Sequence, residues 1–198
     1  MYPESVNGVI QDLFANKAFR GLLFKTRFLL ALVLLVPLAR YMHPEWWATA
    51  LGISLAGQLI QTWCFASLVK NRELSVRGPY KLVRNPMYLG RYLLILGFVL
   101  LLRSFVAIGV YTVVYYLYMF NRVKREELRL RRDYPEGFGK YCGDVRRFLP
   151  SFSRLGDPEV WFFDREMFLE NHAHWNILMT VLAYATLFVL HRFWGTLS

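Results

Sequence analysis

The sequence is poor in cysteine and in charged residues. Only Cys64 and Cys142 occur among 198 residues, in different surroundings, which excludes a disulfide framework and a thiolate metal site. Charged residues make up 19% of the chain and hydrophobic residues 56%, so a disordered basic tail is also excluded. The N-terminus lacks the basic start and the small-residue cleavage site of a secretory signal, so we expect it to be unprocessed. The hydrophobic content of the chain is too high for a protein whose whole surface faces water.

Long apolar runs occupy much of the sequence. A membrane-spanning helix needs about 20 apolar residues to cross the hydrocarbon layer. The sequence therefore predicts an all-α integral membrane protein with about five transmembrane helices, a helical hairpin among them, and additional cytoplasmic or interfacial helices. We expect single spans at about 28–42, 46–69 and 175–194.

The stretch 87–120 is apolar but too long for one crossing. It predicts a hairpin that turns at Arg103 and Ser104. The second arm is expected to continue as a helix into water through Arg132.

Two features of the span 46–69 predict helix packing. Ala48, Gly52 and Ala56 recur at intervals of four, which predicts a small-residue face buried against a neighbouring helix. Gln58 and Gln61 favour hydrogen bonds to other helices over contacts with a substrate.

Basic residues outnumber acidic ones by 24 to 14, giving a net charge of +10. Most of them flank the expected spans on one side, and lysine and arginine beside spans stay in the cytoplasm. The charge therefore predicts the orientation of the chain, with its polar segments on the cytoplasmic side. No RNA- or DNA-binding motif is present, so we expect no nucleic-acid partner.

Two segments, at 6–14 and 157–168, have the pattern of helices that lie flat on a membrane. In the second, Asp157 and Pro158 form an N-cap and a first-turn pair. Without an internal repeat or a low-complexity linker, we expect one domain over 1–198.

Two cytoplasmic segments, 69–90 and 121–150, are richer in specific residue types than connectors need to be. In the first, Gly78 and Pro79 signal a turn and Pro86 opens the next helix, so the intervening backbone has groups free to bind a ligand.

In the second segment, Arg122 and Glu126 stand four apart and share one helix face. They place a cation beside an anion, either as an ordinary ion pair on a solvated helix or as a site for a ligand that carries both signs. His172 and His174 are two apart and face different sides of a helix, so we expect no metal site.

The order of the motifs in these segments resembles a known family. The run from Leu74 to Gly90 reads LSVRGPYKLVRNPMYLG, and after an apolar hairpin come EELRL from Glu126, FGKY from Phe138 and RRFLP from Arg146. This arrangement is similar to the isoprenylcysteine carboxyl methyltransferase family, membrane methyltransferases that are related to phospholipid methyltransferases. The resemblance covers about 45–150, with 151–198 as an extension that carries an interfacial helix and an extra span.

The resemblance implies S-adenosylmethionine as cofactor, bound by helices and cytoplasmic loops. The chain has no GxGxxG fingerprint, which agrees with that expectation. Arg122 matches the arginine that orients the substrate carboxylate. The residues matching the family's cofactor contacts are Arg72, Glu73, Leu74, Ser75, Tyr80, Asn85, Pro86, Met87, Tyr88 and Glu126. Asn85 departs from the family's histidine, so a titrating role is lost while an amide can still donate a hydrogen bond.

The acceptor is expected to be lipophilic and to enter from the bilayer among the membrane lipids. A carboxylate is already ionised at neutral pH, whereas a lipid amine must lose a proton, for which Glu127 is the candidate general base. No histidine suits that role, so the sequence favours the carboxylate of an isoprenylcysteine-like molecule. A phospholipid amine or small thiol as acceptor, a sterol-type reductase and a non-enzymatic membrane partner remain alternatives.

Overall fold

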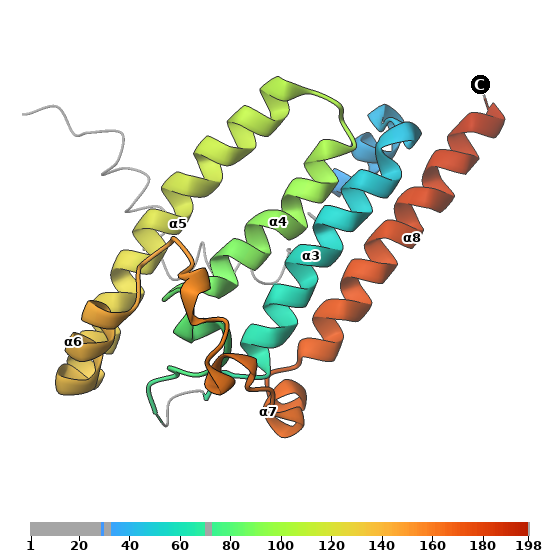
Figure 1. The fold of residues 1–198 in the computed structure, drawn as a ribbon. Coiled ribbons are helices and arrows are strands. Elements are labelled where there is room, and N and C mark those ends of the chain that lie inside the picture. Colours follow the sequence, from blue (N-terminus) through green and yellow to red (C-terminus); the bar gives the residue numbers. More distant parts are fainter. Residues whose placement is uncertain (1–28, 30–32, 70–72, 198) are drawn as a thin grey trace, which may run out of the picture. The chain divides into compact units, whose positions relative to one another are not determined.

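The computed structural model describes residues 29, 33–69 and 73–197, and within these ranges it contains helices and no strands. Figure 1 shows these helices as ribbons coloured along the sequence. The chain divides into two compact units. One contains residues 1–41 and 186–198, and the other contains residues 42–185. The amphipathic segment expected at 6–14 lies outside the described residues.

In the described part of the first unit, residues 33–41 are helical. The Ala39 side chain is fully buried, and its carbonyl lies 3.2 Å from His191 Nδ1.

The second unit holds the other helices. Proline occupies the first turn of several of them, where its missing N–H costs no helical hydrogen bond. In chain order the elements are η1 (Pro44–Trp46), α3 (Trp47–Phe65), η2 (Gly78–Lys81), α4 (Pro86–Leu100), α5 (Phe105–Asp133), α6 (Pro135–Asp144), η3 (Phe152–Arg154), η4 (Pro158–Trp161), α7 (Arg165–Glu170) and the first part of α8 (Ala173–Leu197).

Helices α4 and α5 form the expected hairpin, and its turn lies at Arg103 and Ser104 as predicted. Arg103 has a left-handed φ of 48°, and the Ser104 hydroxyl caps α5 by accepting from the Ala107 N–H at 3.2 Å. The Tyr111 hydroxyl donates to the Tyr92 carbonyl at 3.0 Å and ties the two arms together. Helix α5 continues through the charged segment to Asp133, which confirms the helical extension.

The prediction for the small-residue face of α3 was wrong. Ala48, Gly52 and Ala56 are exposed, and no described atom outside the neighbouring backbone lies within 4 Å of a Cβ built on Gly52. The buried face contains Ala50, Ser54, Gly57, Gln58, Gln61 and Cys64. Two rows of small residues run along different faces of α3. Helix α4 packs against the row that contains Ala50, Ser54 and Gly57, and the prediction chose the other row.

Helices α3 and α4 cross with their backbones in contact at glycines. A Cβ on Gly90 would lie 2.9 Å from the Gly57 carbonyl oxygen, and one on Gly57 would collide with the backbone of α4. Nearby, the Ser54 hydroxyl donates to the Leu94 carbonyl at 2.7 Å. This crossing fixes the start of α4 against α3.

Gln58 behaves as expected, as an interhelical partner. Its Oε1 accepts from the Thr180 hydroxyl of α8 at 2.9 Å. One turn along α8, the Tyr184 hydroxyl donates to Ser54 Oγ at 2.7 Å. Gln61 is buried on the same face of α3.

Only one helix in the described part of the chain, Ala173–Trp194 of α8, is long and apolar enough to cross a membrane. Helix α4 is apolar but has 15 residues, and α5 is long but strongly charged in its second half. The all-α class is thus confirmed, whereas length and composition support one of the roughly five expected spans.

The segment 157–168 is broken into two short helices, so the prediction of one continuous helix was wrong. Asp157 does cap η4, accepting from the Glu159 N–H at 3.0 Å. The next residues are held at the end of α3, because Trp63 Nε1 donates to the Phe162 carbonyl at 3.1 Å and the Asp164 N–H donates to the Ala66 carbonyl at 2.9 Å. These bonds hold the Phe162 backbone outside helical geometry and interrupt the helix.

Candidate functional site

The loop between α3 and α4 is built around a turn that only glycine suits. Gly78 has a φ of 63°, and a Cβ there would collide with the Ser67 side chain. This turn starts η2 and buries Tyr80. The Tyr141 hydroxyl of α6 donates to the Tyr80 carbonyl at 2.6 Å and holds it from the other side.

A second loop, after α6, fixes the residues just before α4. The Arg84 N–H donates to the Arg146 carbonyl at 2.9 Å, and Asn85 Nδ2 donates to the Arg147 carbonyl at 3.2 Å. The carbonyls of the RRFLP motif therefore hold the residues before α4 in place.

Tyr88 connects the two arms of the hairpin at the level where α5 becomes charged. Its backbone carbonyl accepts from the Tyr115 hydroxyl at 2.7 Å, and its own hydroxyl donates to Glu126 Oε2 at 2.8 Å. The Arg122 guanidinium interacts with the same Tyr88 hydroxyl. Partial burial alone would lower the pKa of Arg122, but these interactions with Tyr88 raise it, so the guanidinium stays charged.

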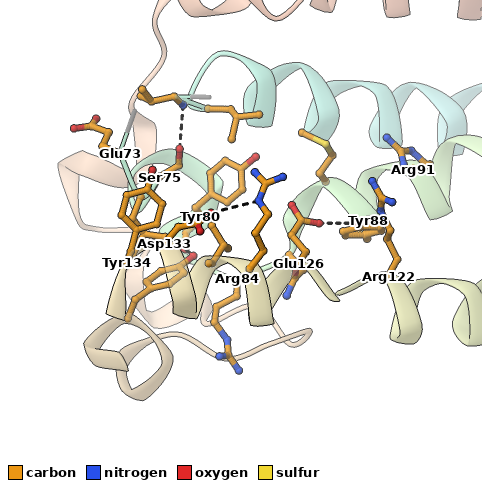
Figure 2. Close-up of a pocket in the computed structure, with 18 of the residues that line it drawn as sticks. Glu73, Ser75, Tyr80, Arg84, Tyr88, Arg91, Arg122, Glu126, Asp133 and Tyr134 are labelled. Atoms are coloured by element: carbon orange, nitrogen blue, oxygen red, sulfur yellow. Dashed lines mark hydrogen bonds and ion pairs between the residues drawn. The ribbon is translucent and has the colours of Figure 1, made fainter. Parts of the chain in front are cut away.

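These elements enclose a pocket of about 580 Å³ (Figure 2), within the range of small-molecule sites. Its walls come from the α3–α4 loop, the start of α4, one face of α5, and α6. The lining residues are Leu68, Val69, Glu73, Leu74, Ser75, Tyr80, Arg84, Asn85, Met87, Tyr88, Arg91, Tyr118, Arg122, Glu126, Arg129, Leu130, Asp133, Tyr134 and Tyr141. The Ser75 hydroxyl orders one edge by accepting from the Val69 N–H at 3.0 Å.

Two buried polar atoms of pocket-lining residues have no hydrogen-bond partner in the part of the chain that the structure describes. They are the Tyr80 hydroxyl and Arg84 Nε. The Cys64 thiol lies near Tyr80, but sulfur is a weak acceptor and no bond of ordinary geometry forms. Burial raises the pKa of Tyr80 well above its usual value, so the phenol keeps its proton and can donate. Unsatisfied buried donors are expected where a ligand supplies the acceptor.

The pocket brings together most of the residues that the sequence singled out. Nine of them line it: Glu73, Leu74, Ser75, Tyr80, Asn85, Met87, Tyr88, Arg122 and Glu126. Pro86 is buried at the start of α4 and does not line the pocket. Arg72 lies outside the described residues.

Glu127 is not among the residues lining the pocket. It is buried, with 9% of its surface exposed, and its carboxylate forms an ion pair with Arg147. Arg84 Nη1 lies 3.7 Å from Glu127 Oε1, and Asn85 Nδ2 lies 3.5 Å from the same oxygen. The geometry gives Glu127 a place in the network that holds the loops together.

Sequence reasoning missed several lining residues of α4, α5 and α6. On α5, Tyr118, Arg122, Glu126, Arg129 and Asp133 all face the pocket. Their spacings of three and four define one helix face. Extending the Arg122 and Glu126 pair in both directions along that face would have found the other three.

Arg91 was also missed, although it follows Tyr88 by three residues and shares its helix face. No group of three or more His, Cys, Asp or Glu side chains that could hold a metal ion occurs among the described residues.

The fold and the pocket define an all-α protein with a charged ligand-sized site at the base of a helical hairpin. A family model described as phospholipid methyltransferase matches residues 46–137, just under half of the chain and including most of the pocket. The match supports the broader group of membrane methyltransferases and does not extend to the isoprenylcysteine-specific branch. No curated protein and no solved structure matches the chain.

Proposed function

We propose that this protein transfers a methyl group from S-adenosylmethionine to a lipophilic acceptor, most simply the carboxylate of an isoprenylcysteine-like molecule. The observation that carries the proposal is the joining of Tyr80, Tyr88, Arg122 and Glu126 in one pocket of about 580 Å³. This pocket lies largely within the segment that the phospholipid methyltransferase model matches. The membrane is the source of the acceptor, and the pocket faces the cytoplasm in the orientation that the charges favour.

The residues present fit the chemistry of the donor. Its amino-acid end carries an ammonium and a carboxylate, and Glu126 is an acceptor for the former. The unpartnered Tyr80 hydroxyl and Arg84 Nε are buried donors suited to its oxygen and nitrogen atoms. Tyr88 and Tyr134 provide aromatic surface beside these groups.

The bound donor supplies a methyl group already activated on a sulfonium, so the protein needs chiefly to align the acceptor and exclude water. Arg122 orients an acceptor carboxylate from the α5 face. The Tyr88 hydroxyl holds the Glu126 carboxylate one turn further along α5, where it is available to the ammonium of the donor. Neither role requires a metal ligand or a covalent nucleophile.

The position of Glu127 favours a carboxylate acceptor over an amine. A lipid amine must lose a proton, and the residue expected to accept it is paired with Arg147 away from the pocket lining. A phospholipid amine stays the second candidate because the matching family model carries that name. For that reaction, the carboxylates available in the pocket lining are Glu73, Glu126 and Asp133.

The first test is cofactor binding by isothermal titration calorimetry with full-length protein in detergent. Glu126→Gln should weaken S-adenosylmethionine binding about 10-fold, because a neutral amide loses a charge-assisted hydrogen bond to the ammonium. Glu136→Gln removes an exposed carboxylate of α6 outside the pocket lining and should leave binding unchanged. Equal binding by wild type and Glu126→Gln would contradict the site assignment.

The second test identifies the acceptor class. Radiolabelled methyl transfer is measured with added farnesylcysteine, with phosphatidylethanolamine and with a small thiol. Label in the farnesylcysteine ester supports the carboxylate reaction, and label in the phospholipid supports the amine reaction. Reduction of a sterol that depends on NADPH, without methyl transfer, would contradict the whole proposal and indicate a reductase.

A further inference from the structure

Arg91 and Arg122 approach the same tyrosine from different helices. Arg91 lies in the second turn of α4, and its Cζ is 6.0 Å from the centroid of the Tyr88 ring. Arg122 reaches the Tyr88 hydroxyl from α5. Figure 2 shows both guanidinium groups at one end of the pocket, whereas Glu73 and Asp133 lie at the opposite end.

These two arginines form no direct ion pair within the part of the chain that the structure describes, although the Glu126 charge acts on Arg122 from a longer distance. Neither has a carboxylate oxygen within 4 Å of a guanidinium nitrogen in the described ranges. The other arginines of the pocket differ, since Arg84 lies 3.7 Å from Glu127 and Arg129 lies 3.6 Å from Asp133. Two guanidinium groups around one phenol repel each other, and an anion between them removes that cost.

This end of the pocket borders apolar helix surface. After Arg91, α4 carries no further charged residue to its end at Leu100. The α5 segment before Asn121 is uncharged as well. A smaller cavity of about 210 Å³, with mostly apolar walls, shares Asn85 and Tyr88 with the main pocket. An anion bound here therefore has room for an attached apolar group beside it.

We propose that Arg91 and Arg122 together bind the anionic group of an amphiphilic methyl acceptor, and that Arg91 determines specificity for an acidic headgroup. The anion is a carboxylate in a prenylcysteine-like acceptor or a phosphodiester in a phospholipid, and two guanidinium groups suit either. The inference rests on the proposed function and adds to it a residue that recognises the acceptor.

Two competing roles for Arg91 lead to different experimental outcomes. An arginine that only extends toward the headgroup region of the membrane would contribute nothing to selectivity among acceptors. An arginine that binds the carboxylate of S-adenosylmethionine would affect cofactor affinity. Binding of the acceptor and of the cofactor must therefore be measured separately.

The experiment uses full-length protein in detergent and compares wild type, Arg91→Gln, Arg91→Lys and Arg125→Gln. Arg125 is exposed on α5 outside the pocket lining, so its variant controls for the loss of one positive charge. The probes are N-acetyl-S-farnesylcysteine for the carboxylate, lysophosphatidylethanolamine for the phosphodiester, the methyl ester of the first as an uncharged analogue, and S-adenosylmethionine.

Arg91→Gln should weaken binding of at least one anionic probe by about 10-fold or more, the usual effect of losing a charge-assisted bond. Arg91→Lys should recover part of that loss, and Arg125→Gln should behave as wild type. Affinity for the methyl ester and for S-adenosylmethionine should not change. The probe whose affinity falls identifies the carboxylate or the phosphodiester as the ligand.

Three results would overturn the inference: no binding of either anionic probe to wild type, equal loss in Arg91→Gln and Arg125→Gln, or a loss confined to S-adenosylmethionine. Failure of the proposed function gives a different result from failure of this inference. If the proposed function is wrong, wild type does not bind S-adenosylmethionine, while binding of the anionic probes to wild type and Arg91→Gln still tests the role of Arg91.

Discussion

Tyr88 is the residue on which the charged end of the pocket depends. Its carbonyl, hydroxyl and ring each have a partner: Tyr115, Glu126 and Arg91 respectively. The hydroxyl holds the Glu126 carboxylate at a defined position without neutralising it. A phenol keeps its proton more readily than a histidine does, so this arrangement is insensitive to pH near neutrality.

We therefore predict that Tyr88→Phe keeps the packing and loses function. The ring and its contact with Arg91 remain, but Glu126 loses its hydrogen-bond donor. S-adenosylmethionine affinity should fall about 5-fold to 10-fold in calorimetry, with little change in the thermal unfolding midpoint. Tyr116→Phe, on an exposed residue of α5, is the control. Wild-type affinity in Tyr88→Phe would show that Glu126 needs no positioning.

At the scale of secondary-structure elements, the site depends on how closely α3 and α4 approach. Their crossing at Gly57 and Gly90 fixes the start of α4, which carries Met87, Tyr88 and Arg91. The loop after α6 then holds Arg84 and Asn85. Two separate segments, α3 and the loop after α6, thus position five residues before and within the first turns of α4.

Gly57→Ala should destabilise the protein by about 1–3 kcal/mol, the usual cost of overpacking, because its Cβ meets the α4 backbone. Gly52→Ala on the same helix is a matched control, since its Cβ meets open space. It should be neutral or stabilising by up to about 1 kcal/mol through helix propensity. Chemical unfolding in detergent measures both. A similar effect of the two substitutions would contradict the assigned packing face.

A second element-scale prediction concerns the ion pair between η2 and η4. Lys81 Nζ lies 2.7 Å from Asp157 Oδ2. Hydrogen bonding from Lys81 lowers the pKa of the Asp157 carboxyl, and hydrogen bonding to Asp157 and Glu159 raises the pKa of Lys81. A lowered carboxyl pKa contributes stability above its unfolded value of about 3.9, and this contribution is lost as the pH falls through the folded value.

The thermal midpoint of wild type should therefore exceed that of Asp157→Asn at about pH 6, and the difference should shrink as the pH falls to about 3 and below. Since both groups lie at the surface, the difference should also decrease in high salt. A difference that does not vary with pH would mean that the pair contributes through packing alone.

At the scale of the whole molecule, the sequence predicts the helical class, the hairpin and most of the pocket. These were accessible because an apolar run too long for one crossing must turn, and because Arg122 and Glu126 four apart share a face. The packing face of α3 could not be predicted from the sequence, because Ala48, Gly52 and Ala56 form as good a small-residue row as Ala50, Ser54 and Gly57. Only the position of the neighbouring helix decides between them.

The interruption of the helix at 162–164 could not be predicted from the local sequence pattern either. It is produced by Trp63 and Ala66, about 100 residues earlier in the chain, which bond to Phe162 and Asp164. The ion pair between Glu127 and Arg147 could not be predicted either, because nothing in the spacing of the sequence brings these two residues together. Tertiary hydrogen bonds override the local helix signal at 162–164, and a tertiary ion pair fixes the partner of Glu127.

The most direct measurement of the central claim is an experimentally determined structure of the full-length protein with S-adenosylhomocysteine at saturation. The account predicts ligand density in the pocket between the α3–α4 loop and α5, with the ammonium within hydrogen-bond distance of Glu126 and a polar ligand atom on the Tyr80 hydroxyl. Ligand density elsewhere, or a pocket that stays empty at saturating ligand, would contradict it.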